Sequence, residues 1–384
     1  MAKILIGTSG WSYDDWVGPF YDSKDNMFSQ YMSIFNTVEI NSTFYEYPSP
    51  SLIMGLARIA PMGFKYSAKM PRLITHKKKF NPERDVGEDI DRFLKLMDIL
   101  KKFDKLGVIL IQLPPISKDK TPWFKDFIEI LPSKKYRFAV EFRDMSWLDN
   151  KTWKILSDKN IAYCIVDEPL LPPEIVVTSD FSYIRWHGHG RRPWYYYEYS
   201  EEELREWVPR IKELSENVKE IYGYFNNHFR GYAPKNALQM LKLLGKTHFG
   251  HEYTLKKIEE YFTKKSIEET KEKAEKILSE RDIRKLLEVF AGSRRLERAI
   301  DMPNEMVRID EIDDKHIVAK VKDYIIEINM KEKYIMHNCD DWRKRVKEKK
   351  FCKHVCKLFL MLPEELSLKI LGDIVKNIDE WKFK

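Results

Sequence analysis

The amino-acid sequence predicts an α/β protein in which a (β/α)8 TIM barrel precedes a charged helical linker and a small α+β zinc-binding domain. Three observations support this fold class. Eight short apolar runs alternate with amphipathic segments up to about residue 248, Lys and Glu dominate after Tyr253, and three of the four cysteines lie close together near the end of the chain. Because 384 residues exceed the size of most single cores, we expect domains over residues 1–250, 251–302 and 303–384.

The eight apolar runs are the expected barrel strands, and helical patterns lie between them. The strands are expected at Lys3–Gly7, Thr37–Ile40, Phe64–Ala68, Gly107–Leu113, Arg137–Phe142, Ile161–Val166, Tyr183–Trp186 and Glu220–Tyr224, and helices at Asp89–Phe103, Pro122–Ile130, Lys151–Asp158, Glu201–Ser215 and Pro234–Leu244. A strand followed each time by a helix favours a closed parallel barrel, with a doubly wound open sheet as the alternative. Since no glycine-rich phosphate loop follows the first strand, the open nucleotide-binding sheet is disfavoured.

The remainder of the chain changes character twice. A Lys/Glu-rich helical run through about Leu296 predicts a connecting helix pair with solvated faces. Strand patterns follow at Met306–Ile309, His316–Val321, Tyr324–Asn329 and Tyr334–Met336, then a helix at Lys353–Met361 and a final amphipathic helix from about Pro363. This order predicts a β-meander that leads directly into the cysteines.

Composition limits the class of protein. A hydrophobic fraction of 43% and a charged fraction of 33% predict a packed globular chain. No run reaches the roughly 18 to 20 apolar residues of a membrane span, so we expect no membrane association and a cytoplasmic location. The net charge of +7 is compatible with an anionic partner.

Polar residues mark the ends of seven of the eight expected strands. They are Glu39, Asn41, Lys69, Gln112, Glu141, Arg143, Asp167, Arg185, His187, Asn226 and Asn227. In a parallel barrel these ends converge on the face that carries the active site, although any single one could be a structural ion pair. Our candidate catalytic residues are Glu39, Lys69, Glu141, Arg143, Asp167, Arg185, His187 and Asn227.

The mixture of charges indicates chemistry on phosphate or carboxylate groups. The lysine and the two arginines among these candidates supply fixed positive charge for oxyanions. The two glutamates and the aspartate among them could act as general acid or base, or could hold Mg or Mn. Since His187 is the only histidine at a strand end, a multi-zinc site is poorly supported. The paired amides of Asn226 and Asn227 could instead tie loops together.

Six motifs in the first 250 residues resemble the YecE-like family of unknown function. They are GTSGWSYDDW from Gly7, EINSTFY from Glu39, FKYSAKMPR from Phe64, EFRDMSW from Glu141, RWHG from Arg185 and YFNNH from Tyr224. The resemblance implies a TIM barrel akin in architecture to the sugar isomerase and apurinic endonuclease barrels. It implies no activity, because fold alone does not determine function.

A second group of residues predicts a structural zinc site. His337 and Cys339 end a predicted strand, and Cys352 and His354 open a helix after a 12-residue connection. Two close ligands on each side of a loop suit tetrahedral zinc. The arrangement resembles a SWIM zinc finger, with His337 in place of the family's first cysteine. Cys356 is the alternative ligand to His337.

Basic and aromatic residues beside both sites predict contacts with nucleic acid. The loop between the two halves of the zinc site is rich in cations, and two arginines precede the aromatic run Trp194–Tyr197, which could stack on bases or simply pack. The candidate contacts are Trp342, Arg343, Lys344, Arg345, Lys347, Arg191 and Arg192.

The leading functional hypothesis is a nucleic-acid-processing enzyme, a metal-dependent nuclease or repair-type phosphodiesterase that acts on DNA rather than RNA. A second hypothesis makes Lys69 a Schiff-base nucleophile on an abasic sugar, which requires a lowered lysine pKa. A third is a non-catalytic DNA-binding or scaffold protein in which the barrel docks a partner. Separately, the helical segment or the finger could bind a protein partner.

Overall fold

The computed structural model describes residues 2–191 and 193–384. These residues form two compact units, Met1–Ile258 and Glu259–Lys384, and each has its own hydrophobic core.

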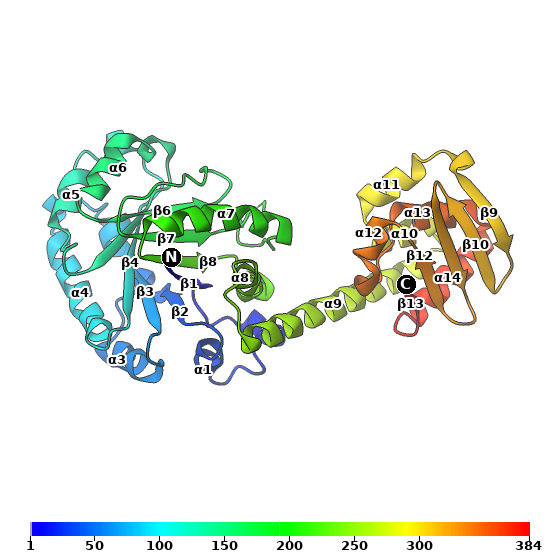
Figure 1. Cartoon of the computed structure of the whole chain (residues 1–384), viewed down its shortest axis with the longest axis horizontal. Helices are drawn as coiled ribbons and strands as arrows, with labels where there is room; N and C mark the ends of the chain where they lie inside the picture. The colour runs from blue at the N-terminus through cyan, green and yellow to red at the C-terminus, as the bar shows by residue number, and fades with distance from the viewer. Residues whose placement is uncertain (1, 192) are drawn as a thin grey trace. The chain divides into compact units, whose positions relative to one another are not determined.

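The first unit is a nearly closed barrel of eight parallel strands, as the sequence predicts (Figure 1). Neighbouring strands follow the order β1-β8-β7-β6-β5-β4-β3-β2. The strands are β1 (Lys3–Thr8), β2 (Thr37–Ile40), β3 (Lys65–Lys69), β4 (Leu106–Gln112), β5 (Arg137–Glu141), β6 (Ala162–Asp167), β7 (Phe181–Trp186) and β8 (Glu220–Phe225).

A glycine allows β1 and β2 to meet at the seam of the barrel. A Cβ atom on Gly7 would lie 2.3 Å from the Thr37 carbonyl oxygen, so no larger residue fits there. Beyond Gly7, Ser9 forms an isolated parallel bridge with Glu39, and the Gly10 amide donates to the Glu39 carbonyl over 2.8 Å. The barrel is therefore joined at its carboxyl end, next to the predicted site.

Helices cover the outside of the strands. Their apolar faces are buried, and side chains cap the starts of three of them: Ser49 at α3, Asp149 at α6, and Ser200 at α7, where Ser200 and Glu203 form a capping box. The helices of this unit are α1 (Met27–Met32), α2 (Ser42–Tyr45), α3 (Pro50–Ile59), α4 (Val86–Lys102), α5 (Phe124–Ile130), α6 (Asn150–Ser157), α7 (Glu201–Asn217) and α8 (Tyr232–Leu243).

The interior of the barrel is filled by alternate residues of the strands. The buried cluster includes Ala139 of β5, Cys164 and Val166 of β6, Tyr183 of β7 and Tyr224 of β8. Because side chains of a strand point alternately to its two faces, the next positions of the same parity also face inward. This parity decides which polar residues reach the mouth of the barrel.

The second unit is a five-stranded sheet with helices. Strands β9 to β12 form an antiparallel meander, and β13 pairs parallel with β12. The elements are α9 (Phe249–Leu278), which begins in the first unit, α10 (Ile283–Ala291), α11 (Ser293–Ile300), β9 (Val307–Ile312), β10 (His316–Val321), β11 (Tyr324–Asn329), β12 (Tyr334–His337), α12 (Asp340–Arg343), α13 (Lys353–Met361), α14 (Glu364–Lys376) and β13 (Lys382–Phe383).

The segment 251–302, predicted as a charged linker, is only partly a connection. Leu287 and Phe290 of α10 and Leu296 of α11 lie in the same buried core as Ile317 and Val355. Charged residues dominate these helices, but a stripe of apolar side chains is enough to bury one face of each. Among the described residues, no helix has the length and apolar character needed to span a bilayer.

Candidate functional site

A buried arginine lies at the centre of the barrel mouth. Arg185, at the end of β7, donates from Nη2 to Glu39 Oε1 over 2.8 Å and from Nη1 to Glu141 Oε2 over 2.7 Å. The Tyr183 hydroxyl donates to the other oxygen of Glu39 over 2.7 Å. Burial would raise the pKa of Glu141, but Arg143 and Arg185 hold it well below its usual range. Both partners of this pair are therefore ionised.

A second guanidinium, that of Arg143, extends this network. It forms ion pairs with Glu141 and Glu168, and its Nη2 lies 3.1 Å from His187 Nε2. Burial raises the pKa of Glu168 to about 7, because Arg143 offsets only part of that effect. Glu168 can therefore gain or lose a proton near neutral pH.

His187 is a neutral member of the network. Burial, and then the charges of Arg143 and Arg185, lower its pKa to about 3. Its Nδ1 lies 3.0 Å from Asn226 Nδ2. The imidazole and the amide thus offer uncharged hydrogen-bonding groups beside two cations.

Lys69, at the end of β3, is the cation of the mouth that lacks a paired carboxylate. Its side chain is buried, and Nζ lies 4.5 Å from the centroid of the Phe44 ring. Across the described residues, no carboxylate oxygen lies within 4.0 Å of Lys69 Nζ. Burial, reinforced by the charge of Arg185, lowers its pKa from 10.5 to about 8. A substantial fraction of this amine is therefore neutral near physiological pH.

A cavity of about 600 Å³ opens at this end of the barrel. Its lining combines side chains from strand ends with an aromatic segment after β7: Arg143, His187, Pro193, Trp194, Tyr195 and Asn226. Its volume falls within the range of small-molecule sites.

Four buried His and Cys side chains form a separate group in the second unit. His337 ends β12, Cys339 precedes α12, and Cys352 and His354 lie at the start of α13. One ligand atom from each lies within 4.8 Å of the others. His337 Nδ1 is 2.7 Å from the Ile325 carbonyl oxygen, whereas the buried Nε2 has no partner among the described residues. This donor set could hold a metal ion.

The geometry favours His337 over Cys356 as the fourth ligand. Cys356 lies on α13, is fully buried in the core, and is absent from the group that converges. Burial raises the pKa of its thiol, and the nearby charges of Arg295 and Asp341 have smaller effects of opposite sign. It therefore behaves as a core residue.

Comparison with known proteins identifies the barrel. A family model described as a protein of unknown function, DUF72, matches residues 5–259. This chain belongs to the DUF72 family. The UPF0759 protein YunF of Bacillus subtilis is 26% identical over 273 residues, which cover 63% of this chain and 94% of YunF. The UPF0759 protein YecE of Escherichia coli K12 is 28% identical over 141 residues, 36% of this chain and 48% of YecE. The predicted YecE-like membership is confirmed.

Two solved DUF72 structures support the fold. A DUF72 protein from Thermotoga maritima superimposes with a TM-score of 0.57 at 33% identity, covering 63% of this chain and 99% of that one. A DUF72 protein from Enterococcus faecalis has a TM-score of 0.56 at 22% identity, covering 64% and 96%. The DUF72 match ends at residue 259, so the His/Cys group lies outside it.

Most predicted site residues of the DUF72 barrel converge at the mouth. Glu39, Glu141, Arg143, Arg185 and His187 contact one another directly or through a shared neighbour. Lys69 lies close enough for four of these charges to influence its pKa.

Two predicted catalytic residues lie on the other face of their strands. Asp167 contacts His189 Nε2 over 2.8 Å and accepts a hydrogen bond from Trp207 Nε1 over 3.1 Å. Asn227 donates to the Tyr197 carbonyl and to Asn236 Oδ1 over 2.9 and 2.8 Å. Both tie the barrel to flanking segments, because they have the outward parity.

Sequence reasoning missed Glu168, the neighbour of Asp167, and preferred Asn227 to its neighbour Asn226. Cys164 and Val166 lie in the barrel interior, so Glu168 continues the inward series, as Asn226 continues that of Tyr222 and Tyr224. Applying the two-residue period from the buried positions would have found both.

The residues predicted to contact nucleic acid differ in how exposed their side chains are. Trp342 is wrong as a contact: it is fully buried, stacks on Phe383 with ring centroids 5.2 Å apart, and donates from Nε1 to the Lys384 carbonyl over 2.6 Å. The aromatic ring thus completes the core beside the His/Cys group. Arg345 forms an ion pair with Asp341, and Arg343 Nη1 lies 3.8 Å from Asp340 Oδ1. The side chains of Arg343, Lys344, Lys347 and Arg191 are exposed. Arg192 lies outside the described residues.

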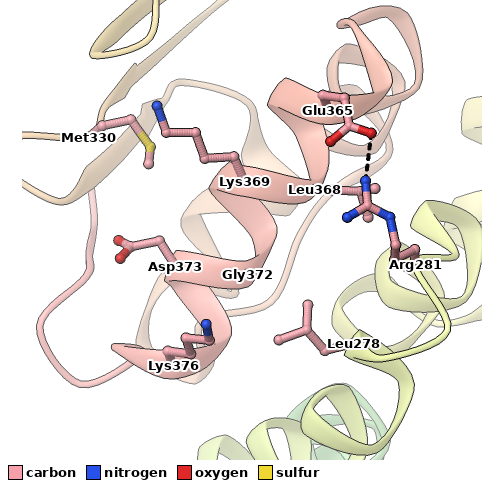
Figure 2. A pocket seen from close by; sticks show the side chains of 9 residues that line it. All are labelled: Leu278, Arg281, Met330, Glu365, Leu368, Lys369, Gly372, Asp373 and Lys376. Atoms are coloured by element: carbon pink, nitrogen blue, oxygen red, sulfur yellow. Dashed lines mark hydrogen bonds and ion pairs between the residues drawn. The ribbon is translucent and has the colours of Figure 1, made fainter.

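A second hollow, of about 520 Å³, lies along α14 in the C-terminal unit (Figure 2). An ion pair between Arg281 and Glu365 spans 2.5 Å at its edge. Asp373 accepts hydrogen bonds from Trp381 and Asn377. Arg281, Glu365 and Asp373 of this hollow are thus engaged in structural contacts, and the barrel mouth is the stronger candidate for catalysis.

Proposed function

We propose that the DUF72 barrel of this chain is a nucleic-acid-processing enzyme in which Lys69 forms a Schiff base with the aldehyde of an abasic sugar. The observation that carries the proposal is a buried lysine with no paired carboxylate among the described residues and a pKa of about 8. At pH 7.5 roughly a quarter of such a lysine is neutral and nucleophilic, against about 0.1% of an ordinary lysine.

The chemistry needs no oxidant or reductant. The neutral amine adds to the aldehyde carbon, and loss of water leaves a C=N bond between Lys69 Nζ and the sugar. Loss of a proton from the adjacent carbon then breaks the C–O bond one carbon further on and releases the phosphate. Water hydrolyses the C=N bond and restores the lysine. Glu168, whose pKa is about 7, is suited to accept and return the proton.

Phosphate recognition is assigned to Arg143. This side chain lines the cavity, and its buried Nε has no hydrogen-bond partner among the described residues. A guanidinium N–H aimed at a phosphate oxygen would form a charge-assisted hydrogen bond. The residue could thus hold an anionic backbone while remaining paired with its carboxylates.

Metal-assisted phosphodiester cleavage is less well supported by the mouth. Glu39 and Glu141 are paired with Arg185, and Glu168 is paired with Arg143. A Mg or Mn ion would have to displace a guanidinium from these oxygens. The experiment below therefore includes both metals.

We also propose that the His/Cys group binds a structural zinc ion as a variant SWIM-type finger. Two thiols and two imidazoles are a common tetrahedral zinc set, and the unpartnered Nε2 of His337 supplies the fourth donor. The exposed cations Arg343, Lys344 and Lys347 would then contact the phosphates of DNA.

The test is covalent trapping with the full-length protein. In the trapping reaction, the protein is incubated with labelled DNA that contains one abasic site and with sodium borohydride, in buffer without added metal. In a parallel cleavage assay, the protein and the same DNA are incubated with Mg or Mn. We expect a trapped adduct that is lost in Lys69→Met and kept in Lys77→Met, which changes an exposed lysine nearby. Cleavage that needs Mg or Mn and survives Lys69→Met would contradict the proposal, as would binding of DNA with neither adduct nor cleavage.

A further inference from the structure

The cavity at the barrel mouth has two chemically different sets of lining residues. Arg143, His187 and Asn226 provide one cation and two uncharged polar groups. Pro193, Trp194 and Tyr195 provide apolar and aromatic surface, and both aromatic rings are only partly buried. This lining suits a ligand that combines an anion with a flat ring system.

The aromatic residues are held in place by stacking. The Tyr195 ring stacks on His228 with centroids 4.4 Å apart and an interplanar angle of 22°. The Tyr13 ring also stacks on His228, with ring centroids 4.6 Å apart and an interplanar angle of 16°. Burial lowers the pKa of His228, so its ring is neutral at physiological pH. Three loops, which follow β1, β7 and β8, thus fix the position of Tyr195.

Two glycines shape the segment that carries these aromatic residues. A Cβ atom on Gly188, whose φ is +90°, would lie 2.8 Å from the Trp194 carbonyl oxygen. A Cβ atom on Gly190 would lie 2.9 Å from the same oxygen and from that of Tyr196. The Gly190 amide donates to the Trp194 carbonyl over 3.1 Å. The segment folds back tightly only because both positions lack side chains.

We propose that this cavity binds a nucleotide, with its base against Trp194 and Tyr195 and its phosphate at Arg143. A base stacked on an aromatic side chain binds about 5- to 100-fold more tightly than one without that contact, whereas a bare sugar phosphate lacks a comparable flat surface. The neutral groups of His187 and Asn226 can hydrogen-bond to base or sugar. The inference rests on the proposed function in one respect: the nucleotide is the neighbour of the abasic sugar that Lys69 attacks.

The experiment measures binding to the full-length protein by calorimetry. The probes are deoxyadenosine monophosphate, deoxyribose 5-phosphate, inorganic phosphate and a short single-stranded oligonucleotide. We expect the mononucleotide to bind at least about 5-fold more tightly than the sugar phosphate, as the stacking energy implies. Tight binding of the oligonucleotide alone would also support the site, provided that it depends on the aromatic residues, and would identify the strand as its source.

Variants separate this inference from the proposed chemistry. Trp194→Ala and Tyr195→Ala should each weaken nucleotide binding about 5- to 100-fold and leave deoxyribose 5-phosphate unaffected. Gly190→Ala should do the same by displacing the Trp194 backbone. Tyr196→Ala is the matched control, because Tyr196 stacks on Phe229 and is absent from the cavity lining. Lys69→Met should keep nucleotide binding even if trapping fails. The inference would be overturned if neither the mononucleotide nor the oligonucleotide bound more tightly than deoxyribose 5-phosphate, or if Trp194→Ala and Tyr195→Ala left the affinity of the tighter of these two probes unchanged.

Discussion

The barrel mouth and the His/Cys group both bury several polar side chains, but they satisfy them differently. At the mouth, the carboxylates of Glu39 and Glu141 each have a guanidinium partner within the same barrel. In the His/Cys group, His337 Nε2 has no partner among the described residues, and three further donors converge beside it. Since an unpaired buried polar group is costly, the carboxylates of the mouth are compensated within the barrel, whereas the zinc ion proposed above would satisfy the donors of the His/Cys group.

The largest effect is expected from removing a ligand of the His/Cys group. Cys352→Ser should lose one zinc per chain and unfold the second unit, because apparent zinc-binding energies of about 10–16 kcal/mol support such domains. Mass spectrometry for the metal and thermal unfolding would measure both. Cys356→Ala is the control and should retain the zinc. Equal zinc content in wild type and Cys352→Ser would show that the group is not a metal site.

The next effect concerns the paired cluster. Arg185→Leu leaves buried Glu39 without a guanidinium partner and removes one of the two that pair with Glu141, so it should cost the barrel roughly 3–5 kcal/mol of unfolding free energy, measured with denaturant. Lys154→Ala, which breaks the exposed pair with Asp158, should cost less than about 1 kcal/mol. Similar losses from the two variants would mean that the buried cluster is not balanced as described.

Lys69 provides a pH-dependent test within the same mouth. The folded pKa is about 8 and the ordinary value is 10.5, so between them the unfolded chain binds more protons and stability rises with pH. Below pH 8 the burial penalty is fully present. Lys69→Met should therefore stabilise the barrel at pH 7 by on the order of 3 kcal/mol, and the gain should disappear as pH approaches 10.5. A gain that is independent of pH would refute the lowered pKa.

The smallest effect is expected at the surface of the second unit. Replacing Arg343, Lys344 and Lys347 by alanine should weaken DNA binding and reduce the slope of log affinity against log salt by about 2 to 3. Lys315→Ala with Lys322→Ala changes two exposed lysines of the same unit and should leave the slope nearly unchanged. Equal effects of the two sets would indicate unspecific charge attraction.

The sequence predicted the elements of the barrel because each strand is a short apolar run and each helix has one apolar face. It also identified the four residues of the His/Cys group, because the two closely spaced pairs along the chain come together in the structure. These features are local, so they can be recognised without knowing what lies opposite.

The remaining errors depend on contacts that are distant in sequence. The sequence places Trp342 in a basic loop, which suggested a contact with nucleic acid. In the structure Phe383, 41 positions later, covers its ring. The lowered pKa of Lys69 depends on burial in the assembled barrel. The cavity needs Tyr195 to meet His228 and Tyr13 from two other loops. None of these pairings has a local sequence signal.

Glu168 and Asp167 face opposite sides of the barrel wall because successive side chains alternate along a strand. The register of each strand therefore decides which of two neighbouring residues reaches the mouth. Insertion of one residue within β6 would exchange the acid at the mouth for the one that holds His189 and Trp207, without changing composition. An insertion in a loop beyond the strand would change neither. The identity of the acid at the mouth therefore depends on the register of β6.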